Sequence, residues 1–499
     1  MLICVAIPGP DLGAIRDQMA KAESQGTMIE WRTDLFNNVG IEDLVSLRHQ
    51  CSLPLVLTLK GNSTNLMFAG VESSLHGILR HLHLLKPEVV DVEMGTRRED
   101  IELIKKTLPD TRVMLSHHDT NQMPSNLRDL LHSMQQFPAD YYKIAVTPKS
   151  AVEALQMVHF TREVNSVGGQ LCGIGMGSEG QITRILAPIS GAPITYACVD
   201  ESVATAPGQL PVQALNGIYG VDRLNYDSMM LGLIGNPVDA SKGYLIHNAV
   251  FKRLSIPAVY VRMCVDANHL PELFQEARRL KWKGFSVTMP LKEAVIPFLD
   301  AIDPSAQAIG AVNTIVLEED RGYVGYNFDG IGALDAIEAR KNVYGQQFIV
   351  LGAGGAAKAI AYEAKQRGAE VTILNRSYGR AEMLAKQLGV HAKPLERLSD
   401  ILRSAPGILA QTTSVGMTPN VNDTLVEAKD LVAGTLVFDA VAYPPETRLL
   451  REAKESGCET VSGVMMWLGQ AERQILQWFD GSASTQEVHV AVLDASEGR

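Results

Sequence analysis

The chain has 499 residues, of which 46% are hydrophobic and 20% are charged, and its formal net charge is −11. One hydrophobic core does not grow to this size, so we expect two large domains. The acidic balance argues against a nucleic-acid partner, and no apolar stretch is long enough to cross a membrane, which leaves small molecules as the expected partners.

Residues 1–224 alternate short strand patterns with helical patterns. Eight strand-like runs occur there, from LICVAI near the N-terminus to ITYACV at residues 194–199. Regular alternation of this kind predicts parallel strands joined by crossover helices. Eight such units favour a closed (β/α)8 barrel, and an open sheet of eight strands is the alternative.

The run YYKIAV, residues 141–146, has one lysine in an otherwise apolar strand. Side chains alternate between the two faces of a strand, and the outer face of a barrel must be apolar to receive the helices, so Lys143 should point inward. A barrel interior is normally filled by aliphatic side chains, so further inward polar residues predict a site. On four other strands the same rule directs inward Glu30, Arg32, Lys60, Asp91, Glu93 and His118.

These residue types together suit imine chemistry. We expect the positive charges of Arg32 and Lys60 to lower the pKa of Lys143. Its shielded ammonium would then lose a proton near neutral pH. The neutral amine can attack a ketone and form an imine. His118 is placed to act as acid and base, with Glu93 as its orienting carboxylate, which suits loss of water next to a ketone. A structural ion pair is the alternative role for Lys143.

The same residues resemble the type I 3-dehydroquinate dehydratase family over nearly all of residues 1–220. The resemblance implies that Lys143 is the Schiff-base lysine and that His118 and Glu93 are catalytic. Lys60 stands where an arginine is common and Thr205 where a serine is common, which predicts weaker substrate affinity with unchanged chemistry. The substrate-binding residues that the resemblance implies are Glu30, Arg32, Lys60, Arg184, Thr205 and Gln209.

The turn-rich stretch GVDRLNYDSM marks a boundary near Asn225, after which strands and helices alternate again. Farther on, FIVLGAGGAAKAI places the spacing Gly352-x-Gly354-x-x-Ala357 between a strand and a helix. Such glycines let the backbone approach a pyrophosphate, whose charge the helix N-terminus meets. A solvated helix start is the alternative. After the next strand, Arg376 stands where NAD-specific proteins carry an acid, so we predict NADP(H) as the cofactor.

Lys292, in GFSVTMPLK, and Asp329, in GYNFDG, form a candidate proton-donating pair. A lysine and an aspartate in a cleft can give a proton to a carbonyl oxygen while hydride arrives from a nicotinamide. Residues 231–481 resemble shikimate dehydrogenase, and the resemblance implies that this pair is catalytic. The substrate-binding residues that it implies are Ser241, Thr288, Asn313 and Gln470. The cofactor-binding residues that it implies are Gly352, Ala353, Gly354, Gly355, Ala356, Asn375, Arg376, Ser377, Thr413 and Gly463.

Four positions depart from the dehydrogenase pattern. Gly243 replaces one of two serines, Phe328 a threonine, Ser286 an asparagine and Ala442 a tyrosine. An unmatched buried polar group costs about 1–3 kcal/mol, so lost hydroxyl groups could shift the preference between shikimate and quinate.

The sequence therefore predicts an α/β protein, with an N-terminal (β/α)8 barrel followed by a two-subdomain dehydrogenase that has a Rossmann NADP-binding domain. The boundaries that we expect are 1–224, 229–330 completed by helices at about 466–485, and 331–465. The expected function is bifunctional: 3-dehydroquinate is dehydrated, and NADPH then reduces 3-dehydroshikimate to shikimate. One alternative is a noncatalytic barrel fused to an active shikimate or quinate dehydrogenase. Another is a dehydrogenase that prefers quinate and NAD.

The six cysteines are scattered, without metal-ligand spacing, which predicts reduced thiols, no metal and a cytoplasmic protein. The N-terminus enters a strand directly, so we expect no export signal. A homo-oligomer is a possible assembly that the sequence leaves open.

Overall fold

The computed structural model describes residues 1–37, 39–59, 82–404, 406–480 and 484–498. None of the helices in these ranges combines the length and apolar character that a bilayer span requires. The chain divides into two compact units. The first comprises Met1–Met230, Pro257–Val265 and Pro271–Lys281, and the second comprises Leu231–Ile256, Asp266–Leu270 and Trp282–Arg499.

The first unit contains an eight-stranded parallel sheet in the order β7-β6-β5-β4-β3-β2-β1-β8. β8 pairs with β1, so the sheet curls into a nearly closed barrel whose two ends are the consecutive strands β7 and β8. The predicted (β/α)8 fold is confirmed. The strands are β1 (Leu2–Ile7), β2 (Met28–Trp31), β3 (Leu55–Leu59), β4 (Val89–Glu93), β5 (Arg112–Asp119), β6 (Tyr141–Val146), β7 (Leu171–Gly175) and β8 (Ile194–Cys198).

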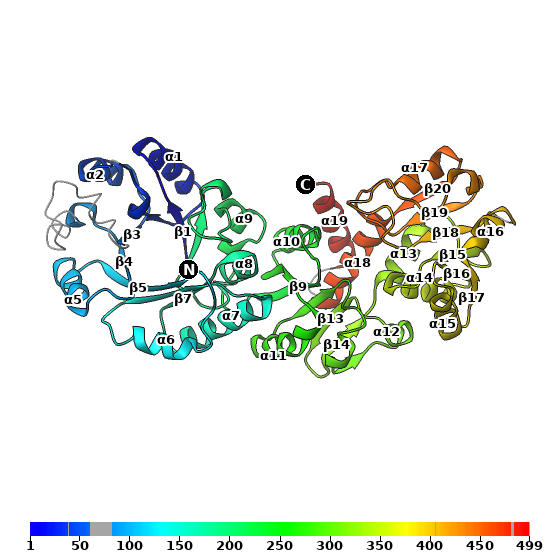
Figure 1. Ribbon diagram of the computed structural model, residues 1–499, viewed down its shortest axis with the longest axis horizontal. Helices are drawn as coiled ribbons and strands as arrows, with labels where there is room; N and C mark the ends of the chain where they lie inside the picture. Colours follow the sequence, from blue (N-terminus) through cyan, green and yellow to red (C-terminus); the bar gives the residue numbers. More distant parts are fainter. Residues whose placement is uncertain (38, 60–81, 405, 481–483, 499) are drawn as a thin grey trace. The chain divides into compact units, whose positions relative to one another are not determined.

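Both faces of these strands are buried, but by different partners. The outward set, such as Ile29, Leu57 and Ile144, is fully buried on the face that the helices cover (Figure 1). The inward set includes Met28, Val56 and other members of one apolar cluster inside the barrel. The helices are α1 (Leu12–Glu23), α2 (Ile41–Gln50), α5 (Arg98–Thr107), α6 (Leu127–Met134), α7 (Ala151–Ser166), α8 (Gly177–Ile185) and α9 (Val212–Gly217).

A second sheet follows, in the order β10-β9-β11-β13-β14-β12. It is mixed, because β13 runs antiparallel to both β11 and β14. Its strands are β9 (Met229–Gly235), β10 (Ala258–Cys264), β11 (Gly284–Val287), β12 (Ala301–Ile302), β13 (Thr314–Glu318) and β14 (Gly322–Tyr326). The helices of this stretch are α10 (Gly243–Arg253), α11 (Leu270–Leu280) and α12 (Pro304–Ile309).

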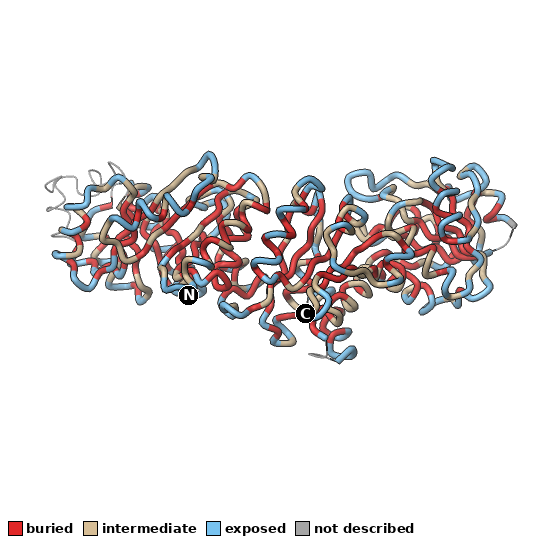
Figure 2. The backbone as a smooth tube through the Cα atoms, turned by 90° about the horizontal axis from the view of Figure 1, so that it is seen from below, coloured by how far each residue is buried: buried red, intermediate tan, exposed pale blue. Residues whose placement is uncertain are grey.

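The third sheet has the order β17-β16-β15-β18-β19-β20, and all its neighbours pair in parallel. This doubly wound arrangement confirms the predicted Rossmann domain. Its central strands are buried (Figure 2). The strands are β15 (Gln347–Leu351), β16 (Glu370–Asn375), β17 (His391–Pro394), β18 (Ile408–Gln411), β19 (Leu436–Asp439) and β20 (Glu459–Ser462). The helices are α13 (Asp329–Glu338), α14 (Gly355–Gln366), α15 (Tyr378–Leu388), α16 (Leu398–Ser404), α17 (Arg448–Glu455), α18 (Gly463–Trp478) and α19 (Thr485–Ser496).

Helix α18 returns from the Rossmann sheet to the mixed sheet. It begins at Gly463, where an added Cβ would lie 2.6 Å from the Ala440 backbone, so only glycine fits this close approach. Near its other end, Trp478 donates a hydrogen bond to the carbonyl of Ile315 on β13. The helix thereby contributes side chains to both halves of the dehydrogenase.

Candidate active sites

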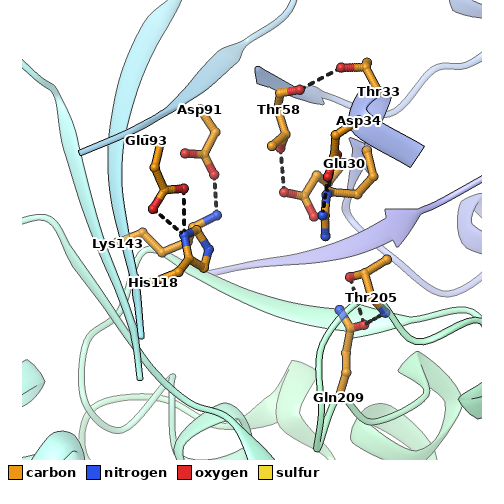
Figure 3. Close-up of polar contacts among 11 residues, drawn as sticks. Glu30, Thr33, Asp34, Thr58, Asp91, Glu93, His118, Lys143, Thr205 and Gln209 are labelled. Carbon is orange, nitrogen blue, oxygen red and sulfur yellow. Dashed lines mark hydrogen bonds and ion pairs between the residues drawn. The ribbon is translucent and has the colours of Figure 1, made fainter. Parts of the chain in front are cut away.

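Lys143 lies inside the barrel, as the strand alternation predicts. Its ammonium forms an ion pair with Asp91 Oδ2 on β4 (Figure 3). The two residues are 4% and 1% exposed, so the pair is shielded from solvent. The ammonium also lies 4.8 Å from the centre of the Tyr196 ring on β8.

The prediction that Lys143 loses its proton near neutral pH is wrong. Burial lowers the pKa of Lys143, but the carboxylates of Asp91 and Glu30 raise it by more, and the net shift is upward. Arg32 does lower this pKa, as expected, but it is the weakest of these influences. The resting amine is therefore an ammonium, paired with the carboxylate of Asp91.

His118 and Glu93 form a second pair, on β5 and β4. The Nδ1 atom of His118 lies 2.9 Å from Glu93 Oε2 and 3.0 Å from Oε1 (Figure 3). In the β5–β6 register Ser116 lies beside Lys143, so His118 is one inward position farther along the neighbouring strand. The contact at Nδ1 orients the ring and leaves Nε2 for proton transfer.

Glu30 and Arg32 lie on and directly after β2, and each has a polar partner. Glu30 is buried and accepts a hydrogen bond of 2.6 Å from the hydroxyl of Thr58. Arg32 donates two hydrogen bonds to Asp34, of 2.8 and 2.6 Å. Lys60, the remaining predicted cation of this group, lies outside the described residues.

Arg184 is a buried cation that faces no carboxylate at hydrogen-bonding distance within the described ranges. It is 3% exposed, and its Nη1 lies 3.5 Å from the carbonyl of Tyr196. Its Nε atom has no partner within those ranges. Burial lowers the pKa of Arg184 to about 10. A guanidinium in this condition is suited to a bound anion.

Thr205 and Gln209 lie on one loop and contact each other. The backbone nitrogen of Thr205 donates to Gln209 Oε1 at 2.8 Å, and Gln209 Nε2 donates to the carbonyl of Ala197 at 3.0 Å. The loop packs tightly on the start of α8, because a Cβ on Gly208 would lie 2.0 Å from the Gly177 oxygen. Gly208 also has a φ of +74°, which favours glycine.

In the second unit, Lys292 and Asp329 lie together, with 2.5 Å between Nζ and Oδ2. Asp329 is 1% exposed and accepts a second hydrogen bond, of 2.9 Å, from the amide of Asn313 at its other oxygen. The amide of Asn313 also lies 3.4 Å from Gln470 Oε1. Four predicted residues from separate parts of the chain thus meet at one point.

Ser241 and Thr288 are the other two substrate-binding residues that the sequence predicts in this unit. Thr288 follows β11, and its carbonyl accepts a hydrogen bond from Leu291, which forms the turn that carries Lys292. Ser241 precedes α10, where its hydroxyl accepts a hydrogen bond of 3.4 Å from the nitrogen of Gly243.

The predicted cofactor residues gather at one edge of the Rossmann sheet. Residues 352–356 follow β15, residues 375–377 end or follow β16, Thr413 follows β18 and Gly463 follows β20. Since these strands are parallel, all four segments lie at their carboxyl ends, where open α/β sheets bind ligands.

This edge fits a dinucleotide. Gly352 has a φ of +122°, and a Cβ there would lie 2.6 Å from Thr412 Oγ1. At Gly354, which caps α14, a Cβ would meet open space, so the backbone can be approached closely. The first turn of α14 carries no acidic residue, and Arg376 is exposed after β16. The N-terminus of α14 and the exposed guanidinium of Arg376 suit phosphate groups.

The dinucleotide edge and the Lys292 pair are neighbours. A Cβ on Gly355, the first residue of α14, would lie 3.3 Å from Lys292 Cδ. In addition, Lys358 on α14 forms an ion pair of 2.7 Å with Glu293. The proton-donating pair therefore lies beside the turn at which a dinucleotide would bind.

Comparison with known families accounts for both units. Residues 3–226 match the model for type I 3-dehydroquinase. Residues 233–315 match the shikimate dehydrogenase substrate-binding domain, and residues 335–447 match shikimate/quinate 5-dehydrogenase.

Two relatives match nearly the whole chain. The bifunctional chloroplastic 3-dehydroquinate dehydratase/shikimate dehydrogenase of Arabidopsis thaliana is 35% identical over 99% of this chain and 84% of that protein. The chain belongs to the bifunctional 3-dehydroquinate dehydratase/shikimate dehydrogenase family. The shikimate biosynthesis protein AroDE of Chlamydia pneumoniae is 29% identical over 96% of this chain and 95% of its own. A crystal structure of a shikimate dehydrogenase in complex with NADP+ shares 35% identity, covers 54% of this chain and 96% of that one, and has a TM-score of 0.51.

Three residues of this bifunctional enzyme were not assigned a role from the sequence. Asp91, the partner of Lys143, shares a strand and a face with Glu93, so strand alternation placed it inward without indicating its contact. Asp34 follows Arg32 by two residues. Gln474 lies one helical turn after Gln470, a spacing that could have revealed it.

Gln474 forms hydrogen bonds with residues that adjoin the dehydrogenase site. It is fully buried, accepts a hydrogen bond of 2.9 Å from Ser286 and donates one of 2.9 Å to Thr314. The hydroxyl of Thr314 in turn lies 2.8 Å from Asn313 Oδ1. Ser286, which departs from the family pattern, thus contacts Gln474 within a network that fixes Asn313.

Proposed function

We propose that Lys143 forms an imine with 3-dehydroquinate in the barrel, and that Lys292 and Asp329 protonate 3-dehydroshikimate during its NADPH-dependent reduction to shikimate. The chain is a bifunctional enzyme of the shikimate pathway by its family membership. The observation that carries the proposal is that Lys143 and the His118–Glu93 pair occupy one barrel lumen, on neighbouring strands.

In the barrel, the amine of Lys143 attacks the substrate ketone, and loss of water gives an imine that acidifies the adjacent C–H bond. His118 removes that proton, with Glu93 stabilising the imidazolium through its contact at Nδ1. His118 then returns a proton to the departing hydroxyl group. Water finally releases 3-dehydroshikimate from Lys143.

Substrate orientation falls to the residues around the lysine. Arg184 is suited to the substrate carboxylate, because it is a buried guanidinium whose Nε has no partner within the described part of the chain. Glu30, Arg32, Thr205 and Gln209 would bind the substrate hydroxyl groups. Lys60 is proposed for the same role on the basis of the sequence alone.

In the dehydrogenase, Lys292 donates a proton to the ketone oxygen, and Asp329 keeps its ammonium in place. Asn313 and Gln470 would bind substrate hydroxyl groups beside this pair, with Ser241 and Thr288 at the carboxylate end. NADPH, when bound, supplies the hydride.

The chain's own residues that would hold NADPH are those at the carboxyl edge of the Rossmann sheet. Residues 352–356 would approach the pyrophosphate, and Asn375, Arg376 and Ser377 the 2′-phosphate. Thr413 and Gly463 would lie on the nicotinamide side. A related structure that contains NADP+ supports this choice of cofactor.

The domains that we propose are residues 1–224, residues 229–330 completed by helices at about 466–485, and residues 331–465. All six cysteines are free thiols, which supports a reducing compartment such as the cytoplasm. The partners are the small-molecule substrates of the two reactions.

A coupled assay tests this function. The whole chain, given 3-dehydroquinate and NADPH, should produce shikimate, with NADPH oxidation following dehydration. Quinate with NAD or NADP serves as the comparison, because Gly243 removes a hydroxyl group near the substrate end of α10. Production of 3-dehydroshikimate without NADPH oxidation would refute the dehydrogenase half, and reduction of added 3-dehydroshikimate without dehydration would refute the barrel half.

A further inference from the structure

We propose that Asp91 is a catalytic acid and base of the dehydratase: it accepts the proton that the Lys143 ammonium must lose, and it returns that proton to the hydroxyl group that leaves as the imine forms. This inference rests on the proposed dehydration at Lys143. It assigns a chemical task to a carboxylate that the mechanism above does not use.

The contacts of Asp91 are incomplete. One carboxylate oxygen, Oδ2, holds the Lys143 ammonium. The other, Oδ1, is buried and has no hydrogen-bond partner within the described ranges. A buried carboxylate oxygen without a donor is unfavourable, so this position fits a group that arrives with the substrate. The hydroxyl group made when the amine adds to the ketone is such a donor, next to Lys143.

The Lys143 ammonium must lose a proton before it can react with the substrate. An ammonium has no free electron pair, so Lys143 cannot attack until a proton leaves it. The site is shielded from solvent, and Asp91 Oδ2 is already in contact with the ammonium. Transfer to Asp91 turns a buried ion pair into two neutral groups, which a buried site tolerates.

The steps balance. The ammonium gives one proton to Asp91, and the amine electron pair forms the C–N bond while the carbonyl electrons move to oxygen. A second proton passes from the nitrogen to that oxygen, which gives a neutral hydroxyl group. Asp91 then protonates the hydroxyl, the C–O bond breaks, and water leaves. The nitrogen electron pair forms the C=N bond, and the protonated imine faces the regenerated Asp91 carboxylate.

Other groups around Lys143 are less suited to this task. Glu30 raises the pKa of Lys143 through space, but it is hydrogen-bonded to Thr58. Burial raises the pKa of the thiols of Cys4 and Cys172 and of the phenol of Tyr196, so these groups stay neutral. Among the described residues, Arg32, Arg184, His118 and Glu93 are further charged or titratable groups near this pair.

The wild-type chain provides the first test, by rapid mixing with 3-dehydroquinate and quenching with borohydride at a series of pH values. Internal transfer to Asp91 predicts that the rate of trapping on Lys143 is nearly constant between about pH 6 and 8. If the ammonium had to lose its proton to solvent, the rate would rise about tenfold per pH unit in that range, because the pKa of Lys143 is raised. That rise would overturn the inference.

The Asp91→Asn variant provides the second test, with Glu30→Gln as the matched control for the loss of one nearby carboxylate. Asp91→Asn should slow trapping by about 10²-fold or more at every pH, the scale of lost acid–base catalysis. A purely structural ion pair predicts the opposite, since removal of Asp91 frees the amine and leaves trapping near neutral pH equal or faster. Glu30→Gln should weaken substrate binding and slow trapping far less.

Reduction of 3-dehydroshikimate by the same preparations is the internal check on the chain's integrity, and it should match wild type. If Asp91→Asn unfolds the barrel, the wild-type pH series still decides. If wild-type chain that dehydrates its substrate gives no adduct on Lys143, the proposed function fails. If the wild type gives the adduct and Asp91→Asn forms it as fast, only the inference about Asp91 fails.

Discussion

The two halves of the chain each contain a lysine–aspartate pair with a buried aspartate, and the two pairs are supported differently. In the dehydrogenase, both oxygens of Asp329 are engaged, one by Lys292 and one by Asn313. In the barrel, Asp91 holds Lys143 with one oxygen, and its other oxygen has no partner in the described ranges.

The difference matches two kinds of chemistry. Lys292 has to hold one geometry while it gives a proton to an oxygen, so a network that fixes its partner is useful. Lys143 has to lose a proton and form and break a covalent bond, so its partner must change hydrogen bonds during the reaction. The same ion pair therefore serves either role, according to what surrounds the carboxylate.

The comparison is tested most severely by Lys143→Ala. The variant should lose dehydration by roughly 10⁴-fold or more, the scale at which enzymes lose activity when a nucleophile is removed. Reduction of 3-dehydroshikimate with NADPH should remain near wild type, measured in separate assays. Loss of both activities in folded protein would show that the two sites are not independent.

Lys292→Ala should give the converse result. Loss of the proton donor should lower the reduction rate by about 10²–10⁴-fold, while dehydration stays near wild type. Steady-state assays of each half measure the two rates. Reduction at the wild-type rate would remove Lys292 from the mechanism.

The strands and their faces could be predicted because a period of two, read over eight segments, determines which side chains point into a barrel. Lys143, His118 and Glu93 followed from that rule, and the carboxyl edge of the Rossmann sheet followed from its glycine spacing. Local patterns of this kind need no knowledge of distant contacts.

The protonation state of Lys143 could not be predicted in this way. Its partner lies on β4, two strands away in the sheet and 52 residues earlier in the chain. Strand alternation shows that both side chains point inward, but not that they stand at the same height in the barrel. The same reason explains the missing role for Gln474 on α18, whose partners Ser286 and Thr314 lie on β11 and β13.

Asp439 is a buried aspartate of the dehydrogenase half with no cationic partner among the described residues. It therefore shows how burial alone changes the pKa of a carboxyl group. Burial raises the pKa of Asp439 to about 6, against 3.8 for an ordinary aspartate, because Thr447, Gln411 and Val441 provide only neutral donors. The folded state therefore binds this proton more tightly than the unfolded state. Its contribution to stability is complete below about pH 4 and is lost as pH rises through 6.

Asp439→Asn should remove this pH dependence. Between pH 4 and 8, the free energy of unfolding of the variant should rise by about 3 kcal/mol relative to that of the wild type. This is about 1.36 kcal/mol for each unit by which the pKa is raised. Urea unfolding followed by tryptophan fluorescence at several pH values measures it. A constant difference between the two proteins across this range would contradict the raised pKa.

The smallest expected effect concerns the cofactor, which only one half of the chain uses. Arg376→Ala should raise the KM for NADPH by about tenfold to a hundredfold, the loss of a charge-assisted contact of about 1.5–3 kcal/mol. The KM for NADH should change little, and dehydration not at all. Equal losses for both cofactors would refute a role for Arg376 at the 2′-phosphate.

The most direct test of the central claim uses the whole chain with 3-dehydroquinate and borohydride, followed by peptide mass spectrometry. We predict one covalent adduct, on the peptide that contains Lys143, and none on the peptide that contains Lys292. An adduct at Lys292 or elsewhere, or no adduct from a chain that still dehydrates its substrate, would contradict the assignment of covalent chemistry to the barrel lysine.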